Sequence, residues 1–134
     1  MILRIVAGLI GGLFLLQALA WMIDPAGAAE ALGMPLLDGL ARSTQVGDFT
    51  SFFLALGAMG LIGALRMSGT WLRAGAMLLG GAAVMRTLAW AIHEAAFATE
   101  FIIIEAVAAA TLVFIANRFD AQNASHDQSP SPTN

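Results

Sequence analysis

The chain has 134 residues, of which 59% are hydrophobic and 11% are charged, and its mean hydropathy is +0.81. A typical soluble domain carries about 25% charged residues, so a water-soluble fold of this length could not bury so much apolar surface. The formal net charge is −3, the basic residues are all arginine, and there is no cysteine. This composition argues against nucleic-acid binding and excludes disulfides, thiolate metal sites and cysteine nucleophiles.

Four apolar blocks follow one another along the chain, and each approaches the roughly 17–25 residues that a helix needs to span a bilayer. We predict spans over about residues 4–23, 47–66, 71–93 and 100–117. The predicted fold class is therefore all-α, a four-helix transmembrane bundle whose single domain covers residues 1–118. Short connections make the second and third spans, and the third and fourth, antiparallel neighbours.

The connection between the first two spans is longer and is predicted to hold one or two short interfacial helices. Asp24 and Pro25 are typical of an N-cap and of the first helical position. Gly33 favours a helix stop, and Pro35 then breaks the chain. The apolar residues that follow fit one more short helical turn lying in the membrane interface.

The two ends of the chain carry separate expectations. Residues 119–134 are rich in polar residues and lack an apolar pattern, so a disordered cytoplasmic tail is predicted. At the other end, Arg4, an apolar run and the small residues at 18–20 resemble a signal peptide with its cleavage site. We favour a retained helix, because residues 21–23 continue the apolar run past that site.

The placement of arginine predicts the topology. If the four spans alternate in direction, Arg4, Arg66, Arg73 and Arg118 fall on one side of the membrane and Arg42 falls on the other. Cytoplasmic connections are enriched in Lys and Arg, so both termini are predicted to lie in the cytoplasm.

Small and aromatic residues indicate how the spans pack and where they end. Gly8 and Gly12 have the small-xxx-small spacing that lets helix backbones approach, and we expect such residues to pack spans within one chain. Trp21, Trp71 and Trp90 lie near the ends of blocks, as interfacial aromatic residues do. Trp90 is deep enough to face the bundle as well.

Arg86 and Glu105 interrupt the third and fourth apolar blocks. An arginine in the middle of a span costs roughly 2.5–3.5 kcal/mol on insertion scales, so it normally has a partner or lines a water-filled cavity. The helical rise places both residues in the outer half of the bilayer, near Asp48 at the start of the second span. We predict that Arg86 pairs with Glu105 and that Asp48 is a second acceptor.

Further candidate residues lie at the outer end of the third span. Arg86, Trp90 and His93 share one helical face at i, i+4 and i+7 spacing, and Glu94 follows directly. Two interpretations of this polar cluster stay open. The Arg86–Glu105 pair is either a structural ion pair or part of a binding site for a polar or anionic lipid or metabolite.

The sequence offers little for metal binding or catalysis. His93, Glu94 and Glu100 supply one nitrogen and two carboxylates, but the zincin pattern needs two histidines one turn apart. The chain has neither a nucleophile elbow nor a phosphate-binding glycine loop. We therefore expect no catalytic residues, no metal and no cofactor.

Several short motifs resemble a family of small bacterial four-helix integral membrane proteins classed as a domain of unknown function. The motifs are Pro25, Leu32-Gly33, Gly47-Asp48, Arg86-Thr87-Leu88 and Glu105, and the resemblance covers about residues 1–118. The family pattern has an Arg and a Gly-Gly at the start of the second span, from which Asp48 departs. The resemblance implies a four-helix fold and a bacterial inner-membrane location, but no activity.

The leading hypothesis is a non-enzymatic, multi-pass membrane protein. Its expected partners are membrane lipids and a second copy of the chain in a homo-oligomer, and nucleic acid is not among them. One alternative is a small-molecule or ion transporter subunit that acts as an oligomer, since four short spans leave little room for a path inside one chain. The other is a lipid-modifying membrane enzyme with Glu105 or His93 as its base.

Overall fold

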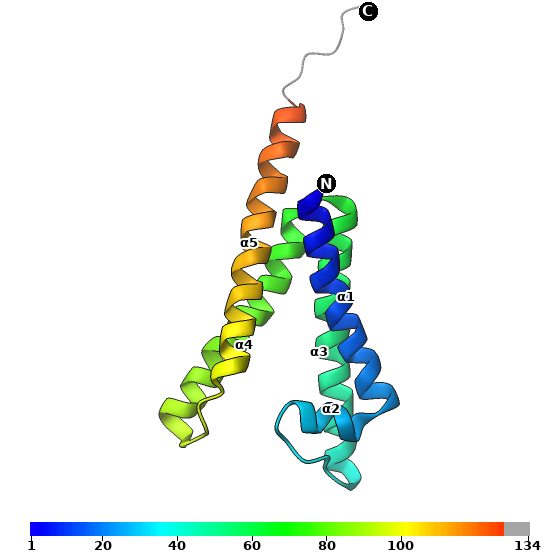
Figure 1. Ribbon diagram of the computed structural model, residues 1–134, viewed down its shortest axis with the longest axis vertical. Coiled ribbons are helices and arrows are strands. Elements are labelled where there is room, and N and C mark those ends of the chain that lie inside the picture. Colours follow the sequence, from blue (N-terminus) through cyan, green and yellow to red (C-terminus); the bar gives the residue numbers. More distant parts are fainter. Residues whose placement is uncertain (128–134) are drawn as a thin grey trace, which may run out of the picture.

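The computed structural model describes residues 1–127, and within them the chain forms helices and no strand. Four helices are long and apolar enough to cross a membrane, by length and composition, and a short helix lies between the first two of them. The predicted all-α class is confirmed, and the chain is a multi-pass membrane protein. The helices are α1 (Ile2–Ile23), α2 (Pro25–Ala31), α3 (Gly39–Arg66), α4 (Gly69–His93) and α5 (Thr99–Asp127) (Figure 1).

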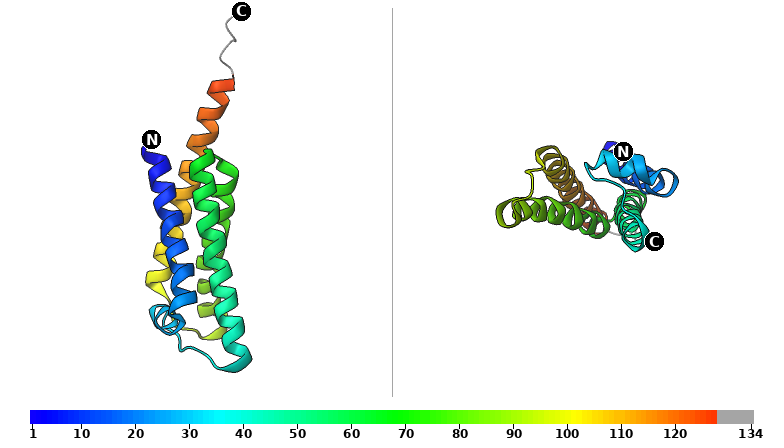
Figure 2. Two further views of the ribbon diagram at one scale, coloured as in Figure 1. Left: turned by 90° about the vertical axis from the view of Figure 1, so that its right-hand side faces the viewer. Right: turned by 90° about the horizontal axis from the view of Figure 1, so that it is seen from below.

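The long helices form two antiparallel pairs. Helix α1 packs along α3, and α4 packs along α5, whereas α3 and α4 share fewer contacts although a tight turn joins them. The pairs meet at the end that holds the N-terminus and the α3–α4 turn, and they splay apart towards the end that holds α2 (Figures 1 and 2). We call these the closed end and the open end.

Glycines let the backbones of α1 and α3 touch. A Cβ atom added to Gly60 would lie 2.7 Å from the Cα of Gly11, so only a residue without a side chain fits there. Gly12 has nothing within 4 Å, and Gly8 meets only the Cβ of Ala64, at 3.9 Å. The close contact on α1 therefore lies one residue away from the predicted Gly8–Gly12 spacing, because Gly11 is on the helix face that α3 covers.

The closed end has a tightly packed core between α4 and α5. Leu72, Leu112, Ile115 and Phe119 are all buried, and Phe119 is only 1% exposed. Lipid tails are as apolar as these side chains, so close packing rather than escape from water holds such a core together.

Polar contacts reinforce the closed end. Arg73 Nη1 lies 2.6 Å from Asp120 Oδ2, which ties the start of α4 to α5. Asn123 Nδ2 donates to the carbonyl oxygen of Met67 in the α3–α4 turn at 3.2 Å. Arg4 Nε donates to the carbonyl oxygen of Ala64 at 3.1 Å, so α1 caps the last turn of α3.

These contacts correct the prediction of a disordered tail. Helix α5 continues through residues 119–127, because Phe119 packs in the core and Asp120 and Asn123 bond to the closed end. Composition alone hid these contacts, since each partner is far away in the sequence. The rest of the predicted tail lies outside the described residues.

The connection at the open end is ordered by side chains. The carboxylate of Asp24 accepts a hydrogen bond from the Gly27 backbone N–H at 3.1 Å, which caps α2 as predicted. Gln45, only 6% exposed, accepts from the Leu37 N–H and donates to the Pro35 carbonyl oxygen. Helix α3 begins at Gly39, so the residues expected to form a second short helix are part of its first turns.

Trp21 is buried inside the protein, although its place near a block end had suggested an aromatic residue exposed at the membrane interface. Its side chain is fully buried, and its ring stacks on that of Phe49 with 4.8 Å between centroids. Helix α2 folds back against α1, and its Ala28 and Ala29 belong to the same buried cluster as Trp21. Trp71 and Trp90 are exposed.

Candidate binding cleft

The splaying of the two helix pairs creates a cleft between them. Its volume is about 960 Å³, and its lining is mostly apolar. Ligand pockets are typically about 300–1,000 Å³, largely apolar, with a few polar groups that fix the orientation of the ligand. The polar side chains in the lining are Gln17, Asp48, Arg86 and Glu105.

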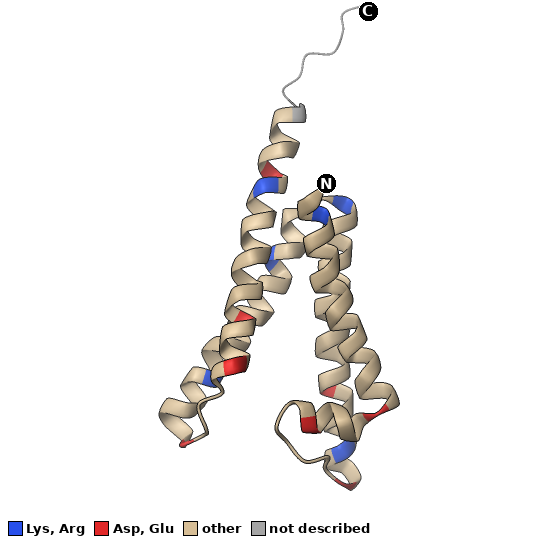
Figure 3. Ribbon diagram, viewed as in Figure 1, with Lys and Arg blue, Asp and Glu red and all other residues tan. Residues whose placement is uncertain are grey.

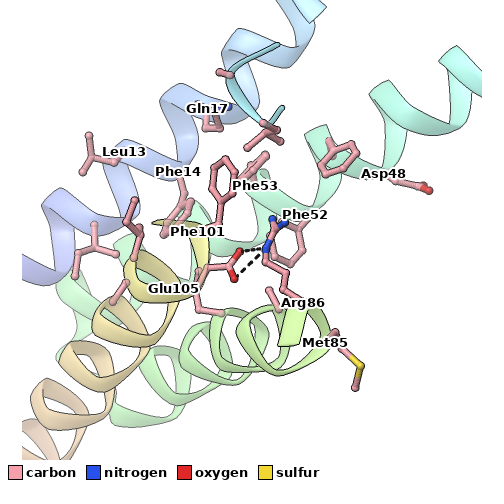
Figure 4. A pocket seen from close by; sticks show the side chains of 18 of the residues that line it. Leu13, Phe14, Gln17, Asp48, Phe52, Phe53, Met85, Arg86, Phe101 and Glu105 are labelled. Atoms are coloured by element: carbon pink, nitrogen blue, oxygen red, sulfur yellow. Dashed lines mark hydrogen bonds and ion pairs between the residues drawn. The ribbon is translucent and has the colours of Figure 1, made fainter. Parts of the chain in front are cut away.

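Arg86 and Glu105 form an ion pair on the α4–α5 wall of the cleft. Nε of Arg86 donates to both carboxylate oxygens of Glu105, at 3.0 and 3.2 Å (Figure 4). The Glu105 side chain is 12% exposed and that of Arg86 is 33% exposed. The two residues meet because α4 and α5 are antiparallel and joined by a short connection, which puts them at similar depth.

The Arg86 guanidinium keeps most of its hydrogen-bonding capacity. Arginine has five N–H donors, one on Nε and four on the two Nη atoms. Within residues 1–127, the hydrogen bonds of this side chain leave from Nε alone. The ring of Phe101 lies 5.0 Å from Cζ, and the guanidinium points across the cleft towards Phe52 and Phe53 (Figure 4). The Nη atoms therefore offer unused hydrogen-bond donors to a molecule in the cleft.

Asp48 does not act as the predicted second acceptor for Arg86. It lines the cleft from α3 but is exposed, and Figure 4 shows its carboxylate pointing away from the Arg86–Glu105 pair. Among the described residues, the ion pair of Arg86 is with Glu105. The reason is the splay of the helix pairs, which separates the start of α3 from the end of α4 at the open end.

The other predicted site residues lie outside the cleft lining. Trp90, His93 and Glu94 are exposed near the end of α4. Trp90 packs edge-to-face on Phe97, with 5.2 Å between ring centroids. Glu94 ends the helix in the left-handed conformation, with φ of 55°. In residues 1–127, no group of three or more His, Cys, Asp or Glu side chains is arranged to hold a metal ion.

An aromatic wall that was not predicted from the sequence lies opposite Arg86. Phe14 of α1 stacks on Phe53 of α3 with 6.1 Å between centroids, and Phe49 stacks on Phe53 at 6.4 Å. Phe52 meets Phe53 edge-on at 5.4 Å. The i, i+3, i+4 spacing of the three α3 phenylalanines was a usable signal, because it places them on one helix face.

Charge is distributed unevenly along the molecule (Figure 3). The open half holds most of the carboxylates and only two arginines, Arg42 and Arg86. Arg42 forms an ion pair with Asp38, with 2.6 Å between Nη2 and Oδ1. The open half therefore carries an excess of carboxylates, and of these Asp48 and Glu105 line the cleft.

The arrangement suits binding better than acid–base chemistry. Both oxygens of Glu105 accept from Arg86, and His93 lies away from the cleft lining. The cleft combines apolar walls with one cluster of hydrogen-bond donors, which is the pattern that an amphiphile needs. Comparisons with protein-family models, curated proteins and solved structures gave no match to this chain.

Proposed function

We propose that this protein binds an amphiphile taken up from the membrane. The apolar part lies between the two helix pairs, and a polar head accepts hydrogen bonds from Arg86. One observation carries this proposal: the Nη donors of Arg86 are unused by residues 1–127 and border a largely apolar cleft of about 960 Å³. Ionisable residues within spans are candidates for functional sites by default, and this one has donors to spare.

Glu105 has a positioning role in this scheme. By accepting two hydrogen bonds from Nε, it fixes the plane of the guanidinium and offsets its charge. The same contact leaves the Nη edge open. The ion pair is therefore both a structural link between α4 and α5 and the support for the binding group.

In this proposal the protein is not an enzyme, and it lies in a bacterial inner membrane with the closed end and both termini on the cytoplasmic side. Arg4 bonds to the last turn of α3, Arg66 ends α3 and Arg73 pairs with Asp120, so all three lie at the closed end. Arg118 directly precedes Phe119 in the core of that end. An excess of arginine marks the cytoplasmic side of multi-pass proteins. Membrane lipids then have lateral access to the cleft from the bilayer.

The test compares bound lipophiles across three proteins purified in the same mild detergent: the full chain, Arg86→Gln/Glu105→Gln and Arg118→Gln. The double variant removes both charges together, so it leaves neither member of the pair as an unpaired charge. Arg118→Gln is the matched control, because Arg118 lies against Phe114 and outside the cleft lining. Native mass spectrometry and organic extraction measure the bound molecule, and circular dichroism checks folding.

We expect a lipophile to copurify with the full chain and with Arg118→Gln, and to be lost from the folded double variant. An equal amount of bound lipophile in the folded double variant would contradict the proposal. So would a full chain that carries no lipophile and takes up neither decylubiquinone, palmitate nor monoolein when each is added.

Transport is a second candidate, favoured by the shape of the cleft. The cleft lies inside one chain, and the helix pairs meet at its closed end, where Leu72 of α4 lies against Gly63 of α3 and Asn123 of α5 bonds to the α3–α4 turn. A path therefore does not require an oligomer. Uptake into liposomes that is lost in the Arg86→Gln/Glu105→Gln variant would distinguish transport from binding alone.

A further inference from the structure

The walls of the cleft differ in chemistry. The α1–α3 wall carries the phenylalanine cluster of residues 14, 49, 52 and 53, in which successive rings stack or meet edge-on. The α4–α5 wall carries Arg86 and Glu105, with one aromatic ring, that of Phe101, 5.0 Å from Arg86 Cζ. Figure 4 shows the Arg86 guanidinium pointing towards the phenylalanine cluster. A head group that contacts both walls meets flat aromatic surface on one side and N–H donors on the other.

The charges disfavour an anionic head group. Arg86 and Glu105 neutralise each other, so the pair offers donors without a net positive charge. An anion moved into this site would lose its hydration without gaining a counter-charge. Asp48 in the lining, and the excess of carboxylates in the open half, would repel it further. A neutral oxygen acceptor avoids both costs.

The aromatic surface favours a planar ring. Aromatic rings attract one another in offset-stacked and edge-to-face arrangements beyond the contribution of buried area. Phe52 is half-buried and lines the cleft, so its ring is available to a bound molecule. A simple acyl chain would gain nothing specific from such a surface.

We infer that the amphiphile has a neutral, planar ring as its head group, with one or more acceptor oxygens, as in the quinone or phenol class. The ring lies against Phe52, and a ring oxygen accepts from the Nη donors of Arg86. The tail follows the apolar lining towards Ile10 and Leu79. This inference rests on the proposed function and names the class of ligand for the same site.

Three probes, each with a single hydrocarbon tail, distinguish the classes of head group. Decylubiquinone has a neutral ring, palmitate has an anionic head without a ring, and monoolein has a neutral head without a ring. Each is titrated into detergent-solubilised full chain, Phe52→Leu, Phe52→Tyr and Phe114→Leu, and bound fractions are measured by native mass spectrometry. Phe114 is 52% exposed and outside the cleft lining, so Phe114→Leu is the matched control.

We expect decylubiquinone to bind most tightly and to lose about tenfold in affinity in Phe52→Leu, which corresponds to about 1.4 kcal/mol. Phe52→Tyr keeps the ring and restores binding, and Phe114→Leu leaves it unchanged. Tighter binding of palmitate or monoolein to the full chain, lost in the Arg86→Gln/Glu105→Gln variant titrated alongside, would overturn this inference and leave the proposed function standing. Decylubiquinone binding that is unchanged in folded Phe52→Leu would also overturn it. Failure of all three probes, with no copurified lipophile, would overturn both proposals.

Discussion

The closed end and the open end of the molecule are built from the same four long helices but are held together in different ways. At the closed end, Phe119 and its neighbours are buried between α4 and α5, and polar contacts tie α5 to the α3–α4 turn. At the open end, the helix pairs separate and leave a cleft between them. Regions with few buried contacts are the ones that open most readily, and binding sites are often located there. We therefore expect the closed end to be rigid and the walls of the cleft at the open end to be more mobile.

The two ion pairs between α4 and α5 illustrate the same difference. Arg73–Asp120 lies at the closed end, with side chains 42% and 48% exposed. Arg86–Glu105 lies on the cleft wall and is better shielded, with Glu105 only 12% exposed. Shielded charges interact more strongly, and they cost more when one partner is removed. The cleft pair should therefore matter more for stability than the surface pair.

The largest effect is expected from the core of the closed end. Phe119→Ala leaves a cavity beside Ile115 and Leu72, and such a truncation of a buried aromatic residue typically costs about 3–5 kcal/mol. Thermal unfolding in detergent, followed by circular dichroism, measures the loss. Phe114→Ala is the control, because Phe114 is exposed on the same helix. Equal melting temperatures for the two variants would show that packing around Phe119 does not stabilise the closed end.

A smaller loss is expected at the cleft. Glu105→Gln removes the carboxylate that faces Arg86 and leaves its guanidinium without a counter-charge. A fully buried pair would lose about 3–5 kcal/mol. Because Arg86 is 33% exposed, we expect about 1–3 kcal/mol, close to the cost of an unsatisfied buried polar group.

The double variant Arg86→Gln/Glu105→Gln is the control for this loss. It should recover much of the melting temperature, because two neutral amides leave no charge unpaired. A double variant that is as unstable as the sum of its single variants would show that the two side chains do not interact in the folded protein.

Much of the fold could be predicted from local sequence. Four long apolar blocks and the Asp24–Pro25 start of α2 follow from residue types that are adjacent in the chain. The contact between Arg86 and Glu105 was expected as well, because a charged residue in an apolar span needs a partner and the rise per residue fixes its depth. These inferences need no knowledge of how the helix pairs are inclined to each other.

Other features depend on that inclination and could not be predicted. The splay of the pairs separates Asp48 from Arg86 and exposes the phenylalanine cluster to the cleft. The continuation of α5 depends on Phe119, Asp120 and Asn123 meeting residues far away in sequence. Periodicity identifies a helix face, but it does not say which neighbour covers that face.

The smallest effect is expected from the surface pair of the closed end. Arg73→Gln removes a contact whose side chains are both more than two-fifths exposed, and exposed ion pairs contribute about 0–1 kcal/mol. Since salt screens exposed charges, the small difference in melting temperature from the full chain should shrink further as salt is raised. The loss in Glu105→Gln should persist under the same conditions, because the cleft shields that pair. If Arg73→Gln lowered the melting temperature as much as Glu105→Gln, the stability of the closed end would depend on its ion pair as well as on packing around Phe119. The two ends would then differ in how their charges are shielded and not in how they are packed.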